Sequence, residues 1–233
     1  MTGTIVRRAE LTLSNEDQML GLMQAHFCDV SPQQFRRDLD EKNWAILITD
    51  EVGRLWGFST LLFYAATFEG RQFDVVYSGD TIVDAGARAD PVLARTWIKA
   101  VNRLRGQAGA KPVYWLLLTS GFRTYRFLSV FWRAFWPRYD APTPPDTQRL
   151  LWGLARERFG EIFDPDSGIV RFPNPQRLRN DLLEIPPGRL ADPHVAFFAA
   201  HNPDFRAGDE LVCLCELSEG NLTIAGRRMV RRP

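Results

Sequence analysis

The sequence predicts an α/β (α+β) architecture in which a mixed, mainly antiparallel sheet is flanked by helices. Three observations support this fold class. The chain has 233 residues, of which 45% are hydrophobic and 24% are charged, as is typical of a soluble globular protein. Residues 44–83 contain three strand-like segments separated by short turns. Farther along, an amphipathic helical stretch lies between two apolar segments, which indicates a crossover between parallel strands.

Two helices are expected before the first strands. Ser14 begins a pattern that resembles a capping box, and apolar residues follow it at helical spacing, so a helix is predicted over Asn15–Phe27. Ser31-Pro32 is a second start signal, because serine is a preferred N-cap and proline is favoured at the first helical position. The second helix is expected to end near Glu41 and to be mostly solvated.

An antiparallel meander follows these helices. Its three expected strands are Trp44–Thr49, Leu55–Ala66 and Phe73–Val83, with turns at 50–53 and 68–72. Gly57 lies inside the second strand and indicates a bulge there. Another bulge is expected at Ser78-Gly79, where it would open a cleft beside the third strand.

The crossover is expected after the meander. Asp90-Pro91 begins an amphipathic stretch that ends near Gly106, and Pro112–Thr119 is an apolar segment typical of a buried strand. We therefore predict that Phe73–Val83 and Pro112–Thr119 are parallel neighbours joined by this helix. A helix over Phe122–Trp132 and a short strand over Ala134–Tyr139 complete this part of the chain.

A proline-rich segment at Asp140–Asp146 marks a boundary. We expect one domain over residues 1–140 and a C-terminal extension over residues 141–233 that packs on it and completes the sheet. The elements expected in the extension are helices at 147–159, 176–184 and 194–200, a hairpin at 161–172, a strand at 209–217 and a short helix after residue 222.

Composition and motifs exclude several classes of function. The net charge of +1 argues against nucleic acid as a partner, since phosphate binding needs a basic excess. No apolar run approaches the roughly 20 residues of a membrane span, and no signal-peptide pattern is present, so a cytoplasmic protein without membrane association is expected. Three cysteines (Cys28, Cys213 and Cys215) make neither a disulfide framework nor a metal-binding spacing, and no metal is expected. Phosphate-loop, dinucleotide-binding and nucleophile-elbow motifs are missing.

One stretch of the sequence is more specific. Residues 77–88 read Tyr-Ser-Gly-Asp-Thr-Ile-Val-Asp-Ala-Gly-Ala-Arg, which places Asp80 inside a strand, where aspartate is disfavoured. Together with the order of the expected elements, this stretch resembles the GNAT-type acyl-CoA N-acyltransferases. Asp80, Val83 and Arg88 match the positions of the family's acidic residue, its valine and the arginine that opens its phosphate loop. The resemblance covers roughly residues 44–139.

The resemblance implies a GNAT-like fold and transfer of an acyl group from a thioester to the amine of a small molecule by direct attack. The co-substrate it implies is a coenzyme A thioester, or the phosphopantetheine of an acyl carrier protein. Its pantetheine arm would pair with the strand that ends near Val83. The donor is accordingly expected near Ile82, Val83, Arg88 and Ala89.

The expected phosphate loop departs from the family pattern. The glycines that follow the family's arginine are replaced by Ala89, Asp90 and Pro91. Glycines let backbone N–H groups approach a phosphate at a helix N-terminus. Proline lacks an N–H, and a carboxylate at the N-cap competes for the same donors. A donor carried by acyl carrier protein, whose phosphate needs a less enclosed loop, is one hypothesis that follows.

Two residues are catalytic candidates. Asp80 is a candidate base, because acyl transfer to an amine needs a group that removes the ammonium proton. The alternative is that Asp80 only caps or pairs at a strand edge. Tyr125 is a candidate acid, because the resemblance implies a tyrosine on the helix after the fifth strand that protonates the departing thiolate. The alternative is a tyrosine that simply packs in the protein.

Two further alternatives stay open at this point. The aromatic residues Trp115, Trp132, Phe135, Trp136 and Tyr139 form either a wall for an acyl group or an ordinary core. The chain is either an enzyme or a catalytically inactive GNAT-like domain that binds a ligand or regulates a partner, since fold alone does not settle function. The acceptor amine, the acyl chain and the oligomeric state are left undetermined by the sequence.

Overall fold

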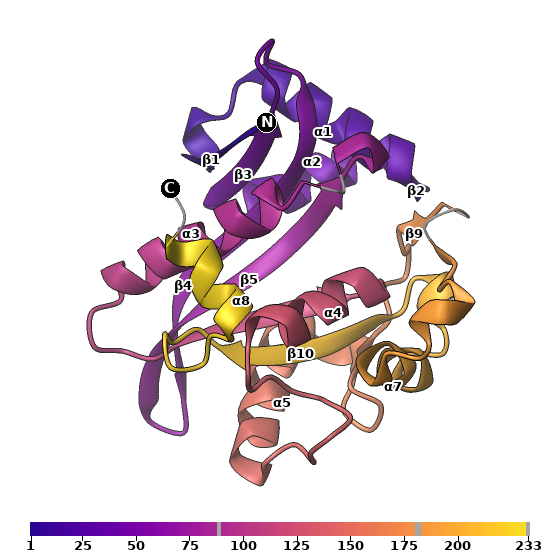
Figure 1. The fold of residues 1–233 in the computed structure, drawn as a ribbon. Helices are drawn as coiled ribbons and strands as arrows, with labels where there is room; N and C mark the ends of the chain where they lie inside the picture. The colour runs from indigo at the N-terminus through magenta and orange to yellow at the C-terminus, as the bar shows by residue number, and fades with distance from the viewer. Residues whose placement is uncertain (88–89, 180–182, 232–233) are drawn as a thin grey trace.

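The fold was determined from a computed structural model that describes residues 1–87, 90–179 and 183–231. Within these residues, eight strands form one mixed sheet in the order β1-β3-β4-β5-β6-β10-β8-β7 (Figure 1). The strands are β1 (Thr2–Arg7), β3 (Trp44–Thr49), β4 (Leu55–Phe68), β5 (Arg71–Val83), β6 (Val113–Thr119), β7 (Phe163–Asp164), β8 (Ile169–Val170) and β10 (Glu210–Glu216). A mixed, mainly antiparallel sheet is therefore confirmed.

The central pair of the sheet is its parallel one. β5 and β6 run parallel and are joined through α3 (Val92–Gln107), whereas every other neighbouring pair in this sheet is antiparallel. The predicted crossover is confirmed. Strands β7, β8 and β10 come from residues after 141 and continue the same sheet beyond β6.

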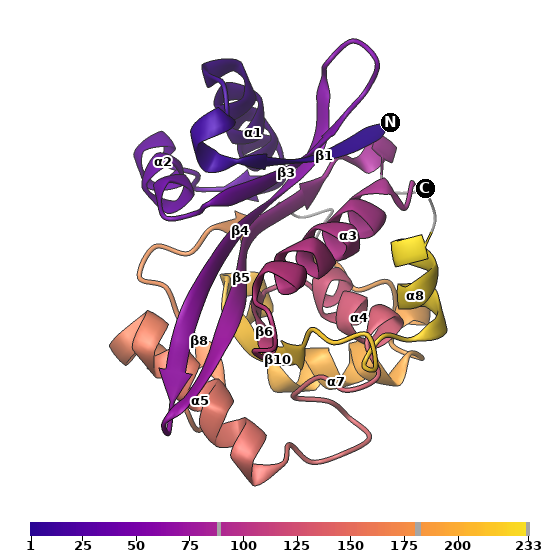
Figure 2. The same ribbon diagram turned by 90° about the vertical axis from the view of Figure 1, so that its left-hand side faces the viewer.

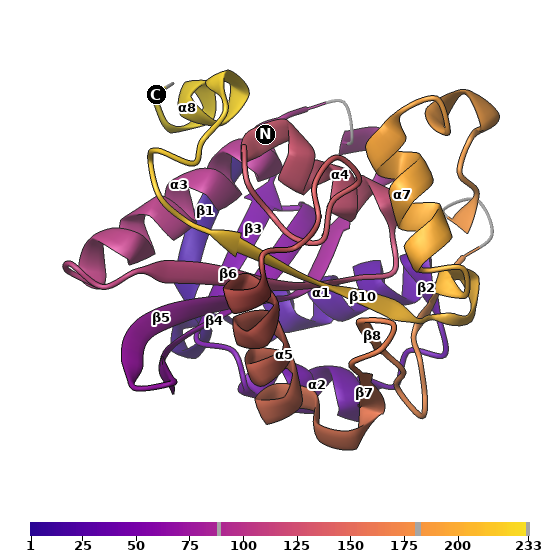
Figure 3. The same ribbon diagram turned by 90° about the horizontal axis from the view of Figure 1, so that it is seen from below.

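Helices cover both faces of the sheet (Figures 2 and 3). α3, α4 (Phe122–Phe131), α7 (Pro193–His201) and α8 (Ile224–Arg231) contribute to the core on one face. On the other face, α1 (Leu13–His26) and α2 (Pro32–Asp40) pack on β3 and β4, while α5 (Pro145–Phe159) packs on β5, β6 and β10. Residues of β5 alternate between these cores: Val76 faces α3, and Val75 faces α5. The central strands are thus buried on both faces, which explains their continuous apolar sequences.

A small second sheet ties the C-terminal part of the chain to α1. It pairs β2 (Phe27–Cys28) with β9 (Arg177–Leu178), and an ion pair of 2.7 Å between Arg177 and Asp29 lies beside it. The helix predicted over 176–184 is therefore wrong at residues 177–178, because these residues pair with a strand that the local sequence does not reveal. Residues 180–182 of that prediction lie outside the described part of the chain.

Other differences from the sequence prediction are local. α1 begins earlier than expected, because Thr12 rather than Ser14 is its N-cap and accepts a hydrogen bond from the backbone N–H of Asn15. The strand expected over 134–139 is reduced to isolated bridges at Trp136 and Arg138, since Pro137 between them has no N–H to donate. β1 was not anticipated, and it pairs along the whole of β3. Single 3₁₀ turns occur at Arg8–Glu10, Ala85–Ala87, Gly160–Ile162, Pro187–Arg189 and Phe205–Ala207.

Candidate functional site

The two parallel strands separate at their C-terminal ends. Hydrogen-bonded pairing of β5 with β6 begins at Asp74 and ends at Ser78 opposite Leu117. β5 nevertheless continues to Val83. Residues 79–82 of β5, beyond Ser78, are therefore not paired with β6.

A bulge in β5 lies at the point of separation. Gly79 and Asp80 together oppose the single residue Thr60 of β4, since the pairing steps from Ser78 to Thr81. The observed bulge is one residue later than the predicted one. A Cβ atom on Gly79 would lie 2.6 Å from Thr60 Oγ1, so only glycine fits here. Because strand side chains alternate, the extra residue shifts the phase and turns Asp80 toward the face that carries α2 and α5.

On the α3 face, the separation opens into a cavity of about 480 Å³, which we call the donor cavity. Ile82 and Val83 line it, as do Asp90 and Pro91 at the start of α3. The expected donor-binding residues Arg88 and Ala89 lie outside the described residues. The rest of the wall is mostly apolar and aromatic: Phe27, Leu93, Ala94, Trp97, Trp115, Phe127 and Leu178.

The start of α3 already has an anionic partner. A carboxylate oxygen of Asp90 accepts a hydrogen bond of 2.9 Å from the backbone N–H of Val92. In a glycine-rich phosphate loop, a backbone N–H at this position would point at the phosphate of the ligand. The structure thus supports the argument, made from the sequence, that Asp90 competes for these donors.

On the opposite face lies a larger cavity of about 760 Å³, which we call the acceptor cavity. Asp80 lines it, together with polar groups from α2, α5 and β10. Six residues line both cavities, which therefore meet where the strands separate. These shared residues are Phe27, Ser78, Thr81, Gly121, Thr124 and Leu178.

The acceptor cavity is rich in carboxyl groups. Burial raises the pKa of Asp80 to about 6, although the positive charge of Lys42 partly offsets this. Burial also raises the pKa of Glu210 to about 8, and the negative charge of Asp80 adds to the shift. Asp38 likewise has a raised pKa, because burial outweighs the hydrogen bond from Gln34.

Only part of this charge is neutralised within the protein. Glu41 forms an ion pair of 2.9 Å with Arg158, whose guanidinium also lies 4.0 Å from the ring centre of Tyr77. Among the described residues, neither Asp80 nor Glu210 forms an ion pair. Half-buried carboxyl groups that perturb one another and face a cavity are typical of functional sites.

The structure brings Asp80, Ile82 and Val83 together but keeps Tyr125 apart from them. Tyr125 is fully buried, its hydroxyl donates a hydrogen bond of 2.9 Å to the Pro137 carbonyl, and it lines neither cavity. Burial raises the pKa of this phenol above its usual value. The preceding residue on α4, Thr124, is the one that faces the separation of the strands.

The aromatic residues singled out in the sequence divide between the two interpretations. Trp132 and Phe135 are buried in the core. Trp115 is equally buried, but it also lines the donor cavity, and its indole N–H donates a hydrogen bond of 2.8 Å to Ser78 Oγ. The aromatic cluster is therefore both core and, through Trp115, the inner wall of the donor cavity.

Sequence reasoning missed Lys42 and Glu210. Both reach the cavity from segments far from β5 in the chain, so no local motif marks them. One signal was available for Lys42: only three of the 29 basic residues are lysines, in a chain that otherwise uses arginine. Within the described residues, no group of three or more His, Cys, Asp or Glu side chains is placed to hold a metal ion.

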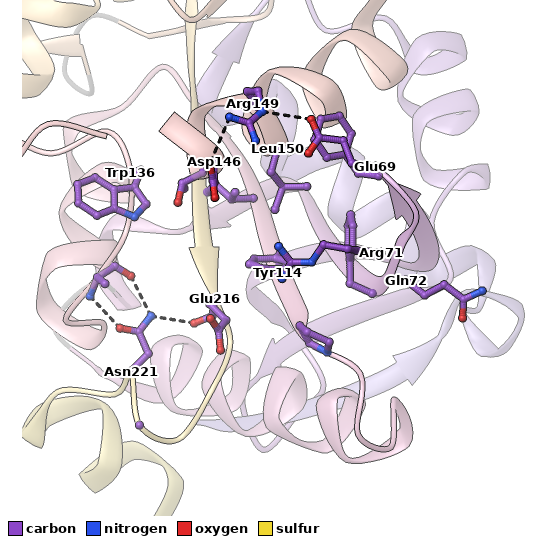
Figure 4. A pocket seen from close by; sticks show the side chains of 17 residues that line it. Glu69, Arg71, Gln72, Tyr114, Trp136, Asp146, Arg149, Leu150, Glu216 and Asn221 are labelled. Carbon is purple, nitrogen blue, oxygen red and sulfur yellow. Dashed lines mark hydrogen bonds and ion pairs between the residues drawn. The ribbon is translucent and has the colours of Figure 1, made fainter. Parts of the chain in front are cut away.

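A further cavity lies at the other end of β5 and β6, and we call it the hairpin-end cavity (Figure 4). Its volume is about 420 Å³, and it contains none of the predicted site residues. Arg149 on its rim lies 3.1 Å from Glu69 and 3.1 Å from Asp146. Three of its five charged residues thus pair with one another, and the other two, Arg71 and Glu216, are exposed.

No family model matches the chain, and no curated protein matches its sequence. Solved structures do match it. One is a conserved protein of unknown function from Enterococcus faecalis, a probable N-acyltransferase, with 14% identity, a TM-score of 0.43 and coverage of 58% of this chain. This chain spans only 33% of that protein's length.

Two other solved structures are acetyltransferases. A Trypanosoma brucei acetyltransferase matches with 16% identity and a TM-score of 0.42, over 60% of this chain and 99% of its own. A GNAT family N-acetyltransferase from Escherichia coli, in complex with CoA, matches with 16% identity and a TM-score of 0.38, over 55% of this chain and 68% of its own. The mixed sheet, with its parallel central pair joined through α3, has the architecture that the sequence resemblance implied, and the function has to be argued from the site itself. In the part of the chain that the structure describes, we find no helix with the length and apolar character of a membrane span.

Proposed function

We propose that the protein transfers an acyl group from a thioester to the amine of a small molecule. One observation carries this proposal. Two cavities on opposite faces of the sheet meet where β5 and β6 separate, and Asp80 lies on the acceptor side of that junction. A donor and an acceptor that enter from opposite faces would meet there, within reach of a base.

The donor is the phosphopantetheine arm of coenzyme A or of acyl carrier protein, with an acyl group on its sulfur. Residues 79–82 of β5, which β6 does not pair, would offer backbone groups to the amides of that arm. The mostly apolar wall of the donor cavity, including Trp97 and Phe127, suits the acyl group. Asp90 already accepts the hydrogen bond from a backbone N–H at the start of α3, so this N–H is not available to a phosphate of coenzyme A. We therefore expect a carrier protein, rather than free coenzyme A, to deliver the acyl group.

In the reaction, the amine nitrogen attacks the thioester carbonyl as Asp80 accepts the proton that the nitrogen loses. A C–N bond forms, the C–S bond breaks, and the sulfur leaves as a thiolate. A pKa near 6 suits Asp80 to this role, since its carboxylate is ionised at neutral pH but more basic than an ordinary aspartate. A thiol with a pKa near 8.5 departs as a thiolate without needing an acid.

Calorimetry with three ligands tests the donor. Coenzyme A, acyl-coenzyme A and acyl-phosphopantetheinyl carrier protein are titrated into the protein, and mass spectrometry then follows acyl transfer to a panel of amines. We expect donor binding and N-acylated products, with the carrier protein binding more tightly than coenzyme A. No binding of any of the three would overturn the proposal. Binding without transfer to any amine would instead support a non-catalytic GNAT-like binding module.

A further inference from the structure

Lys42 is a buried cation at the acceptor cavity. It lies between α2 and β3, only 7% of its surface is exposed, and its side chain lines the cavity. Gly79 makes room for it, because a Cβ atom there would lie 2.7 Å from Lys42 Cε. The bulge that turns Asp80 into the cavity therefore also admits the stem of this lysine.

The ammonium of Lys42 is only partly satisfied. It donates one hydrogen bond of 2.7 Å to the backbone carbonyl of Asp38, at the C-terminal end of α2, and it lies 5.5 Å from the ring centre of Tyr77. An ammonium carries three N–H donors, and helix capping accounts for one of them. Among the described residues, no carboxylate oxygen lies within ion-pair distance of it, and burial lowers its pKa.

The other cation of the cavity is differently placed. Arg158 is held by Glu41 and stacked against Tyr77. Arg158 thus has a direct ion pair inside the protein, whereas Lys42 has none at contact distance and is attracted only at longer range by Asp80, Glu41 and Asp38. Burying an ammonium without a direct ion pair is costly, so an anion that enters the cavity gains from contacting it.

We propose that the acceptor is an amino acid, with its carboxylate held by Lys42 and its amine presented to Asp80. This inference rests on the proposed function and names its substrate class. The charges then alternate around a ring formed by Asp80, the amine, the carboxylate and Lys42. The apolar side chains of Leu62, Phe159 and Phe172 in the same cavity suit an apolar side chain on the acceptor.

The test compares acceptors that differ only in the carboxylate. Phenylalanine is paired with phenethylamine and leucine with isopentylamine, and kcat and KM are measured with one thioester donor. The wild type should use each amino acid at least 10-fold more efficiently than its amine. Lys42→Met should raise KM for the amino acids roughly 10- to 100-fold with kcat little changed, the effect of losing one charge-assisted contact made in both ground and transition states. It should leave kcat/KM for the amines within about 3-fold.

Controls separate binding from folding. Lys99→Met, on α3 and outside both cavities, should change none of these values. Lys42→Gln keeps a hydrogen-bond donor and should fall between the wild type and Lys42→Met; a melting temperature accompanies each variant. Calorimetric titration with phenylalanine and with leucine, without a thioester donor, should show binding that Lys42→Met weakens roughly 10- to 100-fold.

The outcomes distinguish this inference from the proposed function. Acylation of amines without preference for the amino acids, or equal losses on both kinds of acceptor in Lys42→Met, would overturn the role of Lys42 and leave acyl transfer standing. Binding of the amino acids that depends on Lys42, without acylation of any acceptor, would support Lys42 as the carboxylate-binding residue and overturn the enzyme assignment.

Discussion

The acceptor cavity and the hairpin-end cavity lie toward opposite ends of the same two strands, and both contain charged side chains. In the hairpin-end cavity Arg149 pairs with both Glu69 and Asp146 (Figure 4), and the other two charged residues of its lining, Arg71 and Glu216, are exposed to solvent. In the acceptor cavity Asp80 and Glu210 have no ion-pair partner among the described residues, and burial raises both of their pKa values.

The contrast distinguishes charged groups that are exposed or paired within the protein from half-buried ones that lack an ion-pair partner. Exposed ion pairs contribute little to stability and need no further partner. Half-buried carboxyl groups without a partner cost free energy in the folded protein, and the raised pKa values of Asp80 and Glu210 express that cost. Such groups are expected at a site whose ligand supplies the missing charge.

The largest expected effect belongs to Asp80→Asn. The side chains are nearly isosteric, so the fold should survive, while turnover should fall roughly 10²- to 10⁴-fold, the usual contribution of a general base. Donor affinity should change little, because Asp80 lies on the acceptor side. Asp146→Asn in the hairpin-end cavity is the matched control and should keep full turnover. An Asp80→Asn protein that is fully active but has a lower melting temperature would show that Asp80 is structural.

Glu210→Gln should change how stability depends on pH. The folded-state pKa of Glu210 is raised from 4.5 to about 8, so the folded protein binds its proton more tightly than the unfolded chain does. The stability linked to that proton is fully present below pH 4.5 and is lost as the pH rises through about 8. Removing the ionisation should raise the free energy of unfolding at pH 8–9 by up to about 4–5 kcal/mol, and the melting temperature by up to roughly 8–20 °C.

Melting curves from pH 5 to pH 9 measure this effect. Glu69→Gln, which breaks one exposed ion pair at the hairpin-end cavity, is the control and should shift the melting temperature by much less at every pH. If Glu210→Gln and the wild type lose stability in parallel as the pH rises, the carboxyl of Glu210 is not held in the way the structure indicates.

The smallest effect is expected for Tyr125→Phe. This change removes the hydrogen bond from the buried hydroxyl to the Pro137 carbonyl, and it should cost about 1 kcal/mol of stability. Turnover of the folded variant should be unchanged, because the hydroxyl lies outside both cavities. Loss of turnover by 10-fold or more at unchanged stability would restore Tyr125 as the acid. Tyr114→Phe, which removes a tyrosine hydroxyl from the hairpin-end cavity, is the control.

The sequence was sufficient for the framework and for one member of the site. Three strands, the crossover helix and the parallel pairing follow from amphipathic periodicity and from turn residues, which are local properties. Asp80 could be found because an aspartate inside a strand needs a reason to be there.

The remaining parts depend on contacts between distant segments. β9 is only two residues long and exists because it pairs with β2, so its own sequence suggests a helix instead. In the sequence, Glu210 is a polar residue near the start of a predicted strand. Only the order of strands in the sheet brings it near Asp80. Tyr125 and Thr124 are neighbours on α4, but consecutive residues of a helix point in different directions. Only Thr124 therefore faces the separation of the strands.

The most direct test of the account is the pH dependence of kcat/KM for acyl transfer, compared in the wild type and in Asp80→Asn. If Asp80 is the base, its carboxylate must be ionised in the free enzyme. The rate of the wild type should therefore fall below a pKa near 6 in proportion to the ionised fraction, and this acid limb should be absent from the residual rate of Asp80→Asn. An acid limb near pH 6 that persists unchanged in Asp80→Asn, at a rate close to that of the wild type, would contradict the account.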